Sequence, residues 1–102
     1  MDRNIKFSAD TGQIFEWDEH KNELNIAKHG LDFADSAYIF AGTIFTRLDV
    51  REDYGEERWL ATGMLDGRVI VVVYTEPSEN VIRMISARKA LPWEQNQYEK
   101  YL

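Results

Sequence analysis

The stretch RWLATGMLDGRVIVVVYT, residues 58–75, decides the fold class because it has the pattern of a β-hairpin. Asp66 and Gly67 lie at its centre, and this dipeptide is a strong signal for a two-residue turn between antiparallel strands. Residues 69–73 are apolar at every position, which is typical of a strand that is covered on both faces. We therefore expect the second strand of the hairpin at the centre of a sheet.

Three further strands and three helices are expected around this hairpin. The strands are predicted over residues 13–17, 44–50 and 81–88, and the helices over residues 19–29, 33–41 and 92–101. Asp18 is suited to cap the first helix, Gly30 to end it in a left-handed conformation, and Pro92 to open the last helix. The order β-α-α-β-β-β-β-α predicts an α+β fold, a twisted antiparallel β-sheet with two N-terminal helices and one C-terminal helix.

The length and composition predict one globular domain. A chain of 102 residues with 44% hydrophobic content is typical of a single domain and excludes disordered and fibrous classes. Residues 1–12 are polar and are expected to form an N-terminal extension, either disordered or an edge strand, before a domain spanning 13–102. The longest apolar run, residues 69–74, is far shorter than the ~20 residues of a membrane span. Since the start also lacks a signal peptide, we expect a soluble, cytoplasmic protein.

The charge balance restricts the class of partner. Twelve Lys and Arg residues against eighteen Asp and Glu residues give a net charge of −6. Such a protein repels polyanions at long range, so any action on RNA needs a local basic site. The same acidic surface is equally suited to a basic protein partner. The absence of cysteine excludes a thiolate nucleophile and a cysteine zinc site.

The first predicted helix carries a polar stripe that ends in the only well-placed histidine. At about 100° per residue, one sector of this helix contains Asp18, Lys21, Asn25, Lys28 and His29. A neighbouring sector, expected to face the core, contains Trp17, Leu24, Ala27 and Leu31. His20 lies about 13.5 Å from His29 along the axis and half a turn out of phase, so the two are not expected to act together, and since His20 falls in the apolar sector it is expected to be a packing residue. His29 is left as the candidate proton shuttle, and a solvated, well-capped helix end is the alternative explanation of the stripe.

Three arginines of the strands are candidate phosphate ligands. Simple hairpin pairing places Arg58 opposite Thr75 and Arg83 opposite Tyr74, on opposite faces of the sheet. Arg88 follows Arg83 at roughly 17 Å in an extended strand, so a cluster of all three needs a bulge, a strong twist or another register. The alternative is that each arginine pairs with an acidic residue at a solvated strand end. Arg88 is favoured because the N-terminus of the last helix follows it and attracts phosphate.

The remaining side chains point to no cofactor. Phe15, Trp17, Phe33 and Phe40 are expected in the core, and Tyr98 is open to a core, partner or site role. His29 and Asp32 supply two metal ligands at most, which ordinary surface polarity also explains. We therefore expect neither a metal nor a cofactor.

Four segments of the chain resemble the BrnT family of toxins, which belong to type II toxin–antitoxin pairs. The segments are FEWDEHKNELNIAKHGLDF (15–33), GEERW (55–59), DGRVIVVVYTE (66–76) and IRMISARKA (82–90). The family's pattern falls on Trp17, Asp18, Lys21, Asn25, Lys28, His29, Gly30, Phe33, Glu57, Arg58, Gly63, Arg83, Ser86, Arg88, Lys89, Glu94 and Tyr98. Two features depart from it: Leu91 takes the place of a polar helix cap, and the N-terminal extension is longer than usual.

The resemblance implies a fold, an activity and a partner. It implies a RelE-like ribonuclease fold and metal-independent RNA cleavage that inhibits translation. It also implies a ribbon-helix-helix antitoxin of the BrnA type, held with the toxin in a heterotetramer. That complex represses its own promoter, so DNA is contacted only through the antitoxin.

Our leading hypothesis from the sequence is therefore a ribonuclease toxin. His29 would move the proton, while Lys28, Arg58, Arg83 and Arg88 would bind the phosphate and stabilise its transition-state charge. Lys21, Asn25, Lys89 and Tyr98 are candidate substrate-binding residues. Nearby cations would lower the pKa of His29, whereas the helix C-terminus would raise it. The rival hypothesis is a noncatalytic interaction module that binds a basic DNA-binding partner.

Overall fold

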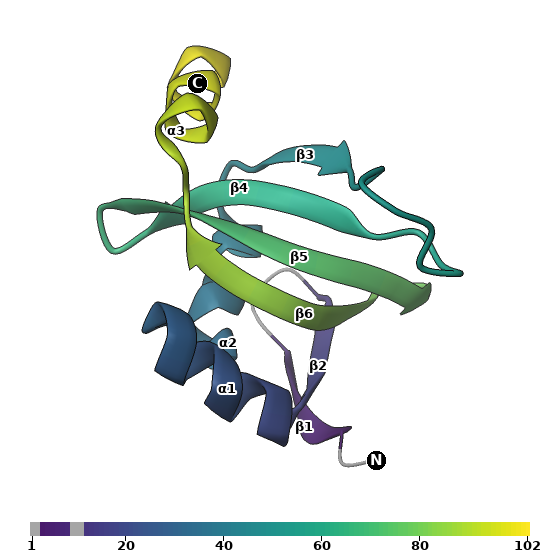
Figure 1. Ribbon diagram of the computed structural model, residues 1–102. Coiled ribbons are helices and arrows are strands. Elements are labelled where there is room, and N and C mark those ends of the chain that lie inside the picture. The colour runs from purple at the N-terminus through teal and green to yellow at the C-terminus, as the bar shows by residue number, and fades with distance from the viewer. Residues whose placement is uncertain (1–2, 9–11) are drawn as a thin grey trace.

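The computed structural model describes residues 3–8 and 12–102 and confirms the α+β fold class (Figure 1). Six strands form one sheet in the order β1-β2-β6-β5-β4-β3. They are β1 (Arg3–Ser8), β2 (Ile14–Asp18), β3 (Phe45–Leu48), β4 (Trp59–Leu65), β5 (Arg68–Ser78) and β6 (Val81–Lys89). The helices are α1 (Glu19–His29), α2 (Phe33–Ser36), the 3-10 helix η1 (Ala37–Ala41) and α3 (Pro92–Tyr101). From β2 onward this order is the predicted one.

The central hairpin forms as expected. Leu65 pairs with Arg68 across the Asp66–Gly67 turn, where both turn residues have positive φ. β5 lies between β4 and β6, and residues 69–73 are all buried. Burial on both faces of one strand explains why its sequence shows no alternation of apolar and polar residues.

The sheet departs from the prediction in one pair of strands. β2 and β6 run parallel, with Phe15 beside Ile82, whereas the sequence predicted antiparallel pairing throughout. The chain crosses from β2 to the far edge of the sheet through α1, α2 and η1, and returns by β3, β4, β5 and β6. Parallel pairing of distant strands through a crossover depends on long-range contacts, which local patterns do not reveal.

The N-terminal segment adds a strand at the edge of the sheet. Residues 3–8 of the expected extension form β1, which pairs antiparallel with β2. Residues 1–2 and 9–11 of that extension lie outside the described residues.

The two faces of the sheet are covered differently (Figure 1). On one face, α2 and η1 complete the main core, in which Phe15 and Trp17 of β2 and Phe33 of α2 are buried as predicted. α3 lies over the other face, where Leu60, Val71 and Val73 form a smaller cluster. None of the helices in the described parts of the chain is long and apolar enough to span a membrane. α3 contacts β4 and covers one end of the second face.

Helix α1 has the predicted ends but not the predicted orientation. The Asp18 carboxylate accepts hydrogen bonds from the first turn, and Gly30 closes the helix with φ 72°. Leu24 and Ala27, which were expected in the core, are exposed, and Asn22 and Asn25 are buried instead. The Asn22 side chain binds Asp32 and the Phe33 amide. α1 therefore docks through amide hydrogen bonds to backbone and caps rather than through an apolar stripe.

The packing role predicted for His20 is also wrong. Its side chain is exposed and lies 3.9 Å from the Glu23 carboxylate. Because α1 docks through Asn22 and Asn25, His20 faces solvent together with Leu24 and Ala27, whereas Trp17 and Leu31, which flank the helix, are buried as expected.

We expect Gly63→Ala to destabilise the protein by roughly 1–3 kcal/mol, the range typical of overpacked cores. A Cβ at Gly63 would lie 2.8 Å from the Ile39 Cβ and 3.2 Å from the Ile44 Cγ2. Gly42→Ala is the matched control, because its nearest neighbour would be the Ile39 carbonyl oxygen at 3.8 Å. Urea denaturation should therefore show a lower midpoint only for Gly63→Ala. Equal midpoints for the two variants would contradict close packing at Gly63.

Candidate functional site

Two irregularities in the pairing of β5 with β6 bring the three candidate arginines to one face of the sheet. Ser78 pairs with Val81, so the turn is shorter than predicted. Glu76 and Pro77 of β5 then lie opposite the single residue Ile82, so Arg83 pairs with Thr75 instead of Tyr74. Trp59 pairs with Tyr74, which places Arg58 next to Thr75 from the other side. The prediction that Arg58 and Arg83 lie on opposite faces is therefore wrong, because a shift of one residue reverses every side chain of a strand.

A β-bulge then brings Arg88 to the same face. Tyr74 pairs with Met84 but Val73 pairs with Ser86, so Ile85 is the extra residue of β6. Arg88 consequently pairs with Val71, whose side chain belongs to the cluster of the second face. Bulges re-aim side chains in this way and are frequent next to active sites.

Helix α1 borders this face along the free edge of β6. β2 pairs only with residues 81–83 of β6. Further along β6, the Asn25 side chain forms hydrogen bonds with the strand backbone. Its amide nitrogen donates to the Ala87 and Leu31 carbonyls at 2.9 Å, and its oxygen accepts from the Ala87 amide at 3.1 Å. Asn25 therefore holds α1 against β6, and it also lines the depression that contains Lys21, Lys28 and His29, so its predicted role in substrate binding stays a prediction.

The residues that the structure brings together are named here the cationic face. They are Lys21, Lys28, His29, Arg58, Arg83 and Arg88. A shallow depression of about 220 Å³ contains Lys21, Lys28 and His29 beside Ser86. A second depression of about 160 Å³ contains Lys21 with Arg58 and Arg83. Since Lys21 lines both depressions, the surface between His29 and the two arginines is continuous.

His29 has a lowered pKa. Burial contributes most, and the positive charges of Lys28 and Arg88 lower the pKa further. The sequence left open whether nearby cations or the helix C-terminus would prevail, and the structure favours the cations and burial. A lowered pKa keeps the imidazole neutral near pH 7, which is the form that accepts a proton.

Buried carboxylates lie beneath two of the arginines. Arg88 binds both oxygens of Glu94, at 2.7 and 2.9 Å, and Arg83 binds Glu16 at 2.8 Å. The Arg88 and Arg83 side chains are 23% and 33% exposed, whereas those of Glu94 and Glu16 are 0% and 7% exposed. The alternative that these arginines pair with acidic residues is thus correct for both. The acids lie inside and the guanidinium groups outside, so an acidic protein still presents positive charge to solvent.

Arg58 is held mainly by an aromatic ring. Its guanidinium carbon lies 4.0 Å from the centre of the Tyr54 ring, a cation–π geometry. The Glu56 carboxylate is 3.9 Å from its Nε and is largely exposed. Arg58 is therefore less neutralised by a buried acid than Arg83 or Arg88.

Two other predicted substrate ligands lie away from the cationic face. Tyr98 is buried, and its hydroxyl donates to the Thr43 carbonyl at 2.7 Å, so it anchors α3. Lys89 pairs with Ile70, a residue of the main core, and strand alternation directs it to the opposite face from Arg88. Neither residue is placed to bind a ligand together with His29.

Comparison with known proteins identifies the family. A family model described as "Ribonuclease toxin, BrnT, of type II toxin-antitoxin system" matches residues 17–94. The chain belongs to the BrnT family. A similar solved structure is that of the Brucella abortus ribonuclease toxin, BrnT, with 35% identity and a TM-score of 0.55. The alignment covers 74% of this chain and 92% of that one. No curated protein matches the chain.

The BrnT match includes the whole cationic face and ends at Glu94, before Tyr98. The family is one of ribonuclease toxins that act in type II toxin–antitoxin systems, which confirms the family expected from the sequence. Within residues 3–8 and 12–102, no three His, Asp or Glu side chains come close enough to hold a metal ion.

Sequence reasoning missed the function of Glu94 and overlooked Arg47. Arg47 Nη2 lies 2.6 Å from a Glu94 oxygen, so one buried carboxylate holds two arginines from distant segments. The Leu91 amide donates to the other oxygen at 2.8 Å. These bonds, with burial opposing them, hold the pKa of Glu94 at about 2. The signal available was an acid at the third position of a helix, where it caps the helix start.

Proposed function

We propose that this chain is an endoribonuclease that cleaves RNA on its cationic face without a metal ion. The observation that carries the proposal is the position of His29, whose pKa is lowered, within reach of the charge of Arg88. α1 supplies the candidate base, and β6 with the segment before β4 supplies three guanidinium groups. We further propose that residues 13–102 form the toxin domain and residues 1–12 an extension of it.

The chemistry follows from these groups. Neutral His29 takes the proton of a ribose 2′-hydroxyl, whose oxygen then attacks the neighbouring phosphorus. The bond from phosphorus to the 5′-oxygen breaks, and that oxygen takes a proton from water. The products are a 2′,3′-cyclic phosphate and a free 5′-hydroxyl. Lys28, Arg58, Arg83 and Arg88 bind the phosphate oxygens and stabilise the additional negative charge of the transition state.

The partner is proposed to be a ribbon-helix-helix antitoxin of the BrnA type. The type II family implies an antitoxin, and a net charge of −6 favours association with a basic DNA-binding protein. The antitoxin would cover the cationic face, and the two proteins would form a heterotetramer that contacts DNA only through the antitoxin. Free toxin would cleave RNA in the cytoplasm and inhibit translation.

Purified protein incubated with single-stranded RNA tests this proposal. We expect cleavage that is unchanged by a chelator of divalent metals, and fragments that end in a cyclic phosphate. Expression without antitoxin should arrest bacterial growth, and Arg88→Ala should relieve the arrest. Loss of cleavage with the chelator would contradict the metal-independent mechanism. Growth arrest by Arg88→Ala and His29→Ala equal to that of the wild type would favour a noncatalytic interaction module.

A further inference from the structure

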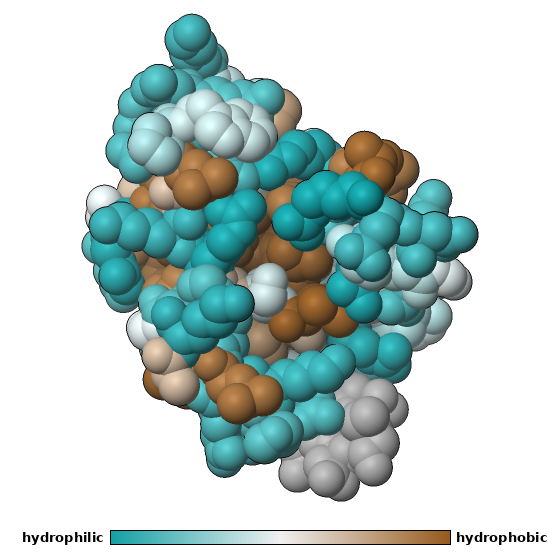
Figure 2. Space-filling view, in the orientation of Figure 1, coloured by the Kyte–Doolittle hydropathy of each residue, from teal (hydrophilic) through white to brown (hydrophobic). Residues whose placement is uncertain are grey.

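A groove next to the cationic face lies between α3 and the end of β3. It has a volume of about 380 Å³ and is lined by Arg47, Asp49, Arg51, Leu60, Arg88 and Trp93, among others. Arg88 belongs to both the groove and the cationic face, so the two surfaces adjoin. Figure 2 shows hydrophobic surface between hydrophilic side chains near the middle of the molecule.

Trp93 is the exposed aromatic residue of this groove. Its side chain is 55% exposed although it lies on the first turn of α3, close to the buried Glu94. The guanidinium carbon of Arg47 lies 5.0 Å from the centre of its ring. The indole is therefore held in place by a cation while much of its surface faces solvent. Such an arrangement is suited to stacking a planar aromatic group.

Of the charged side chains in the groove, the arginines face solvent and the carboxylates are buried. The Arg47, Arg51 and Arg88 side chains are 26%, 64% and 23% exposed. The carboxylates that they bind, Glu94 and Asp49, are 0% and 1% exposed. Arg51 donates two bonds to Asp49, at 2.8 and 2.7 Å, and holds the pKa of that carboxyl at about 2. Three guanidinium groups therefore surround two fully ionised but inaccessible acids.

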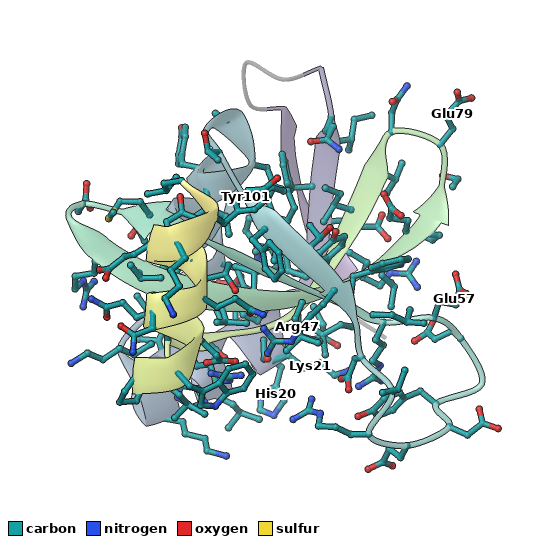
Figure 3. All side chains as sticks on the ribbon, turned by 90° about the horizontal axis from the view of Figure 1, so that it is seen from above. His20, Lys21, Arg47, Glu57, Glu79 and Tyr101 are labelled. Carbon is teal, nitrogen blue, oxygen red and sulfur yellow. The ribbon has the colours of Figure 1, made fainter. Side chains whose placement is uncertain are left out.

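The labelled charged residues of Figure 3 agree with a cationic rim around the groove. In Figure 3, which looks down on this side of the molecule, Arg47 and Lys21 lie near the centre of the view. Glu57 and Glu79 lie at its periphery, on the outer turns. Leu60, Leu48 and Val50 add apolar surface to the groove itself. An apolar floor, an aromatic ring and a cationic rim are the features that bind a nucleobase together with its phosphate.

We infer that this groove is a subsite for one nucleotide of single-stranded RNA, next to the phosphate bound on the cationic face, with its base stacked on Trp93. The inference rests on the proposed ribonuclease function and adds a residue that selects the substrate. Arg47 and Arg51 contact the phosphate of that nucleotide, while Arg88 lies between the subsite and His29. Trp93 is a binding residue, since it does not touch the reacting atoms.

The test measures binding to a short single-stranded oligonucleotide that carries 2′-O-methyl groups, which block cleavage by removing the attacking hydroxyl. A parallel set lacks the base at one position at a time. We expect Trp93→Ala to bind the intact oligonucleotide roughly tenfold more weakly, within the range known for base stacking on aromatic residues. For one abasic oligonucleotide, wild type and Trp93→Ala should have the same dissociation constant. Fluorescence anisotropy measures each constant.

Controls separate stacking from loss of structure. Trp93→Phe keeps an aromatic ring and should retain most of the affinity. Tyr38→Ala removes an exposed aromatic side chain of η1, outside the groove, and should bind like the wild type. The far-UV circular dichroism of Trp93→Ala should match that of the wild type.

Two results would overturn the subsite. One is equal affinity of Trp93→Ala and the wild type for intact and abasic oligonucleotides. The other is weaker antitoxin binding by Trp93→Ala with unchanged RNA affinity, which would make the groove a protein-docking surface. Cleavage of unmodified RNA by the wild type, measured in parallel, tests the proposed function alone. Weaker binding by Trp93→Ala without any cleavage would support the subsite and contradict the ribonuclease mechanism.

Discussion

His29→Ala should slow RNA cleavage by roughly 10²- to 10⁴-fold, the usual contribution of a positioned general acid–base group. The imidazole is the one group on the cationic face that is expected to be neutral near pH 7, since its neighbours are lysines and arginines. Cleavage rates under single-turnover conditions measure the loss. Affinity for the 2′-O-methyl oligonucleotide should change little, because the arginines that bind phosphate remain in place.

His20→Ala is the matched control for this variant. The chain contains two histidines, both on α1, and the His20 side chain is exposed and paired only loosely with Glu23. This variant should cleave RNA at the wild-type rate. A His29→Ala protein with normal cleavage would exclude the imidazole as the proton acceptor. Equal losses in the two variants would indicate a general effect on α1.

The pH dependence of cleavage follows from the lowered pKa of His29. The base is active when neutral, so the rate should fall as pH drops through a pKa below the ordinary value of 6.5. Arg88→Ala removes one positive charge that lowers this pKa, so the acid limb should move to higher pH. NMR titration reads the pKa of His29 directly, because the chain contains only two histidines. An unchanged His29 pKa in Arg88→Ala would show that the two groups do not interact.

Glu94→Ala should lower the free energy of unfolding by roughly 3 kcal/mol. Removing one partner of a buried ion pair typically costs about 3–5 kcal/mol. The lower end applies here because Arg47 and Arg88 keep about a quarter of their side-chain surface in solvent. The variant also loses the acceptor of the Leu91 amide at the start of α3. Urea denaturation followed by circular dichroism measures the change.

Glu99→Ala controls for the loss of a carboxylate from the same helix. Glu99 is exposed and accepts a bond only from Gln95, one turn earlier, among the bonds that the structure describes. We expect its effect to stay within the roughly 0.5 kcal/mol typical of surface substitutions. Similar free energies of unfolding for Glu94→Ala and the wild type would show that the buried ion pairs of Glu94 with Arg47 and Arg88 do not stabilise the fold.

The stabilisation that Glu94 gives the folded protein should depend on pH between about 2 and 4.5. Its pKa is about 2 in the folded protein against 4.5 ordinarily, so its ionised form is stabilised by folding. That stabilisation is complete above about pH 4.5 and is lost as pH falls toward 2. Glu94→Gln lacks this titration. The stability difference between wild type and Glu94→Gln should therefore shrink over that range, while Asp49 titrates alike in both.

Local patterns were sufficient for most elements of the fold. The Asp66–Gly67 turn, the Asp18 and Gly30 caps and the start of α3 at Pro92 were all correctly predicted. Each depends on backbone conformations and hydrogen bonds that one or two residues decide on their own. The family, too, could be recognised from short segments of the chain, and the family model that matches residues 17–94 confirms it.

The candidate site could be predicted only in part. His29 and the arginines were predicted as candidates, and the structure brings them to one face, but Arg58 and Arg83 had been assigned to opposite faces, and Tyr98, which anchors α3, had been taken for a substrate ligand. Strand parity depends on one residue of turn length, which the segment Pro77–Asn80 leaves open. Whether a polar side chain binds a ligand or a backbone group depends on what lies opposite it in the folded chain.

The amino-acid sequence by itself determined the order of the strands and helices, the ends of α1 and the identity of the family, because short stretches of chain encode all of these. Tertiary structure alone decided the parallel contact of β2 with β6, the rotation of α1 and the bulge at Ile85. It also placed Glu94 beneath Arg47 and Arg88. These features depend on packing between segments far apart in the chain, where a shift of one residue changes which side chains meet.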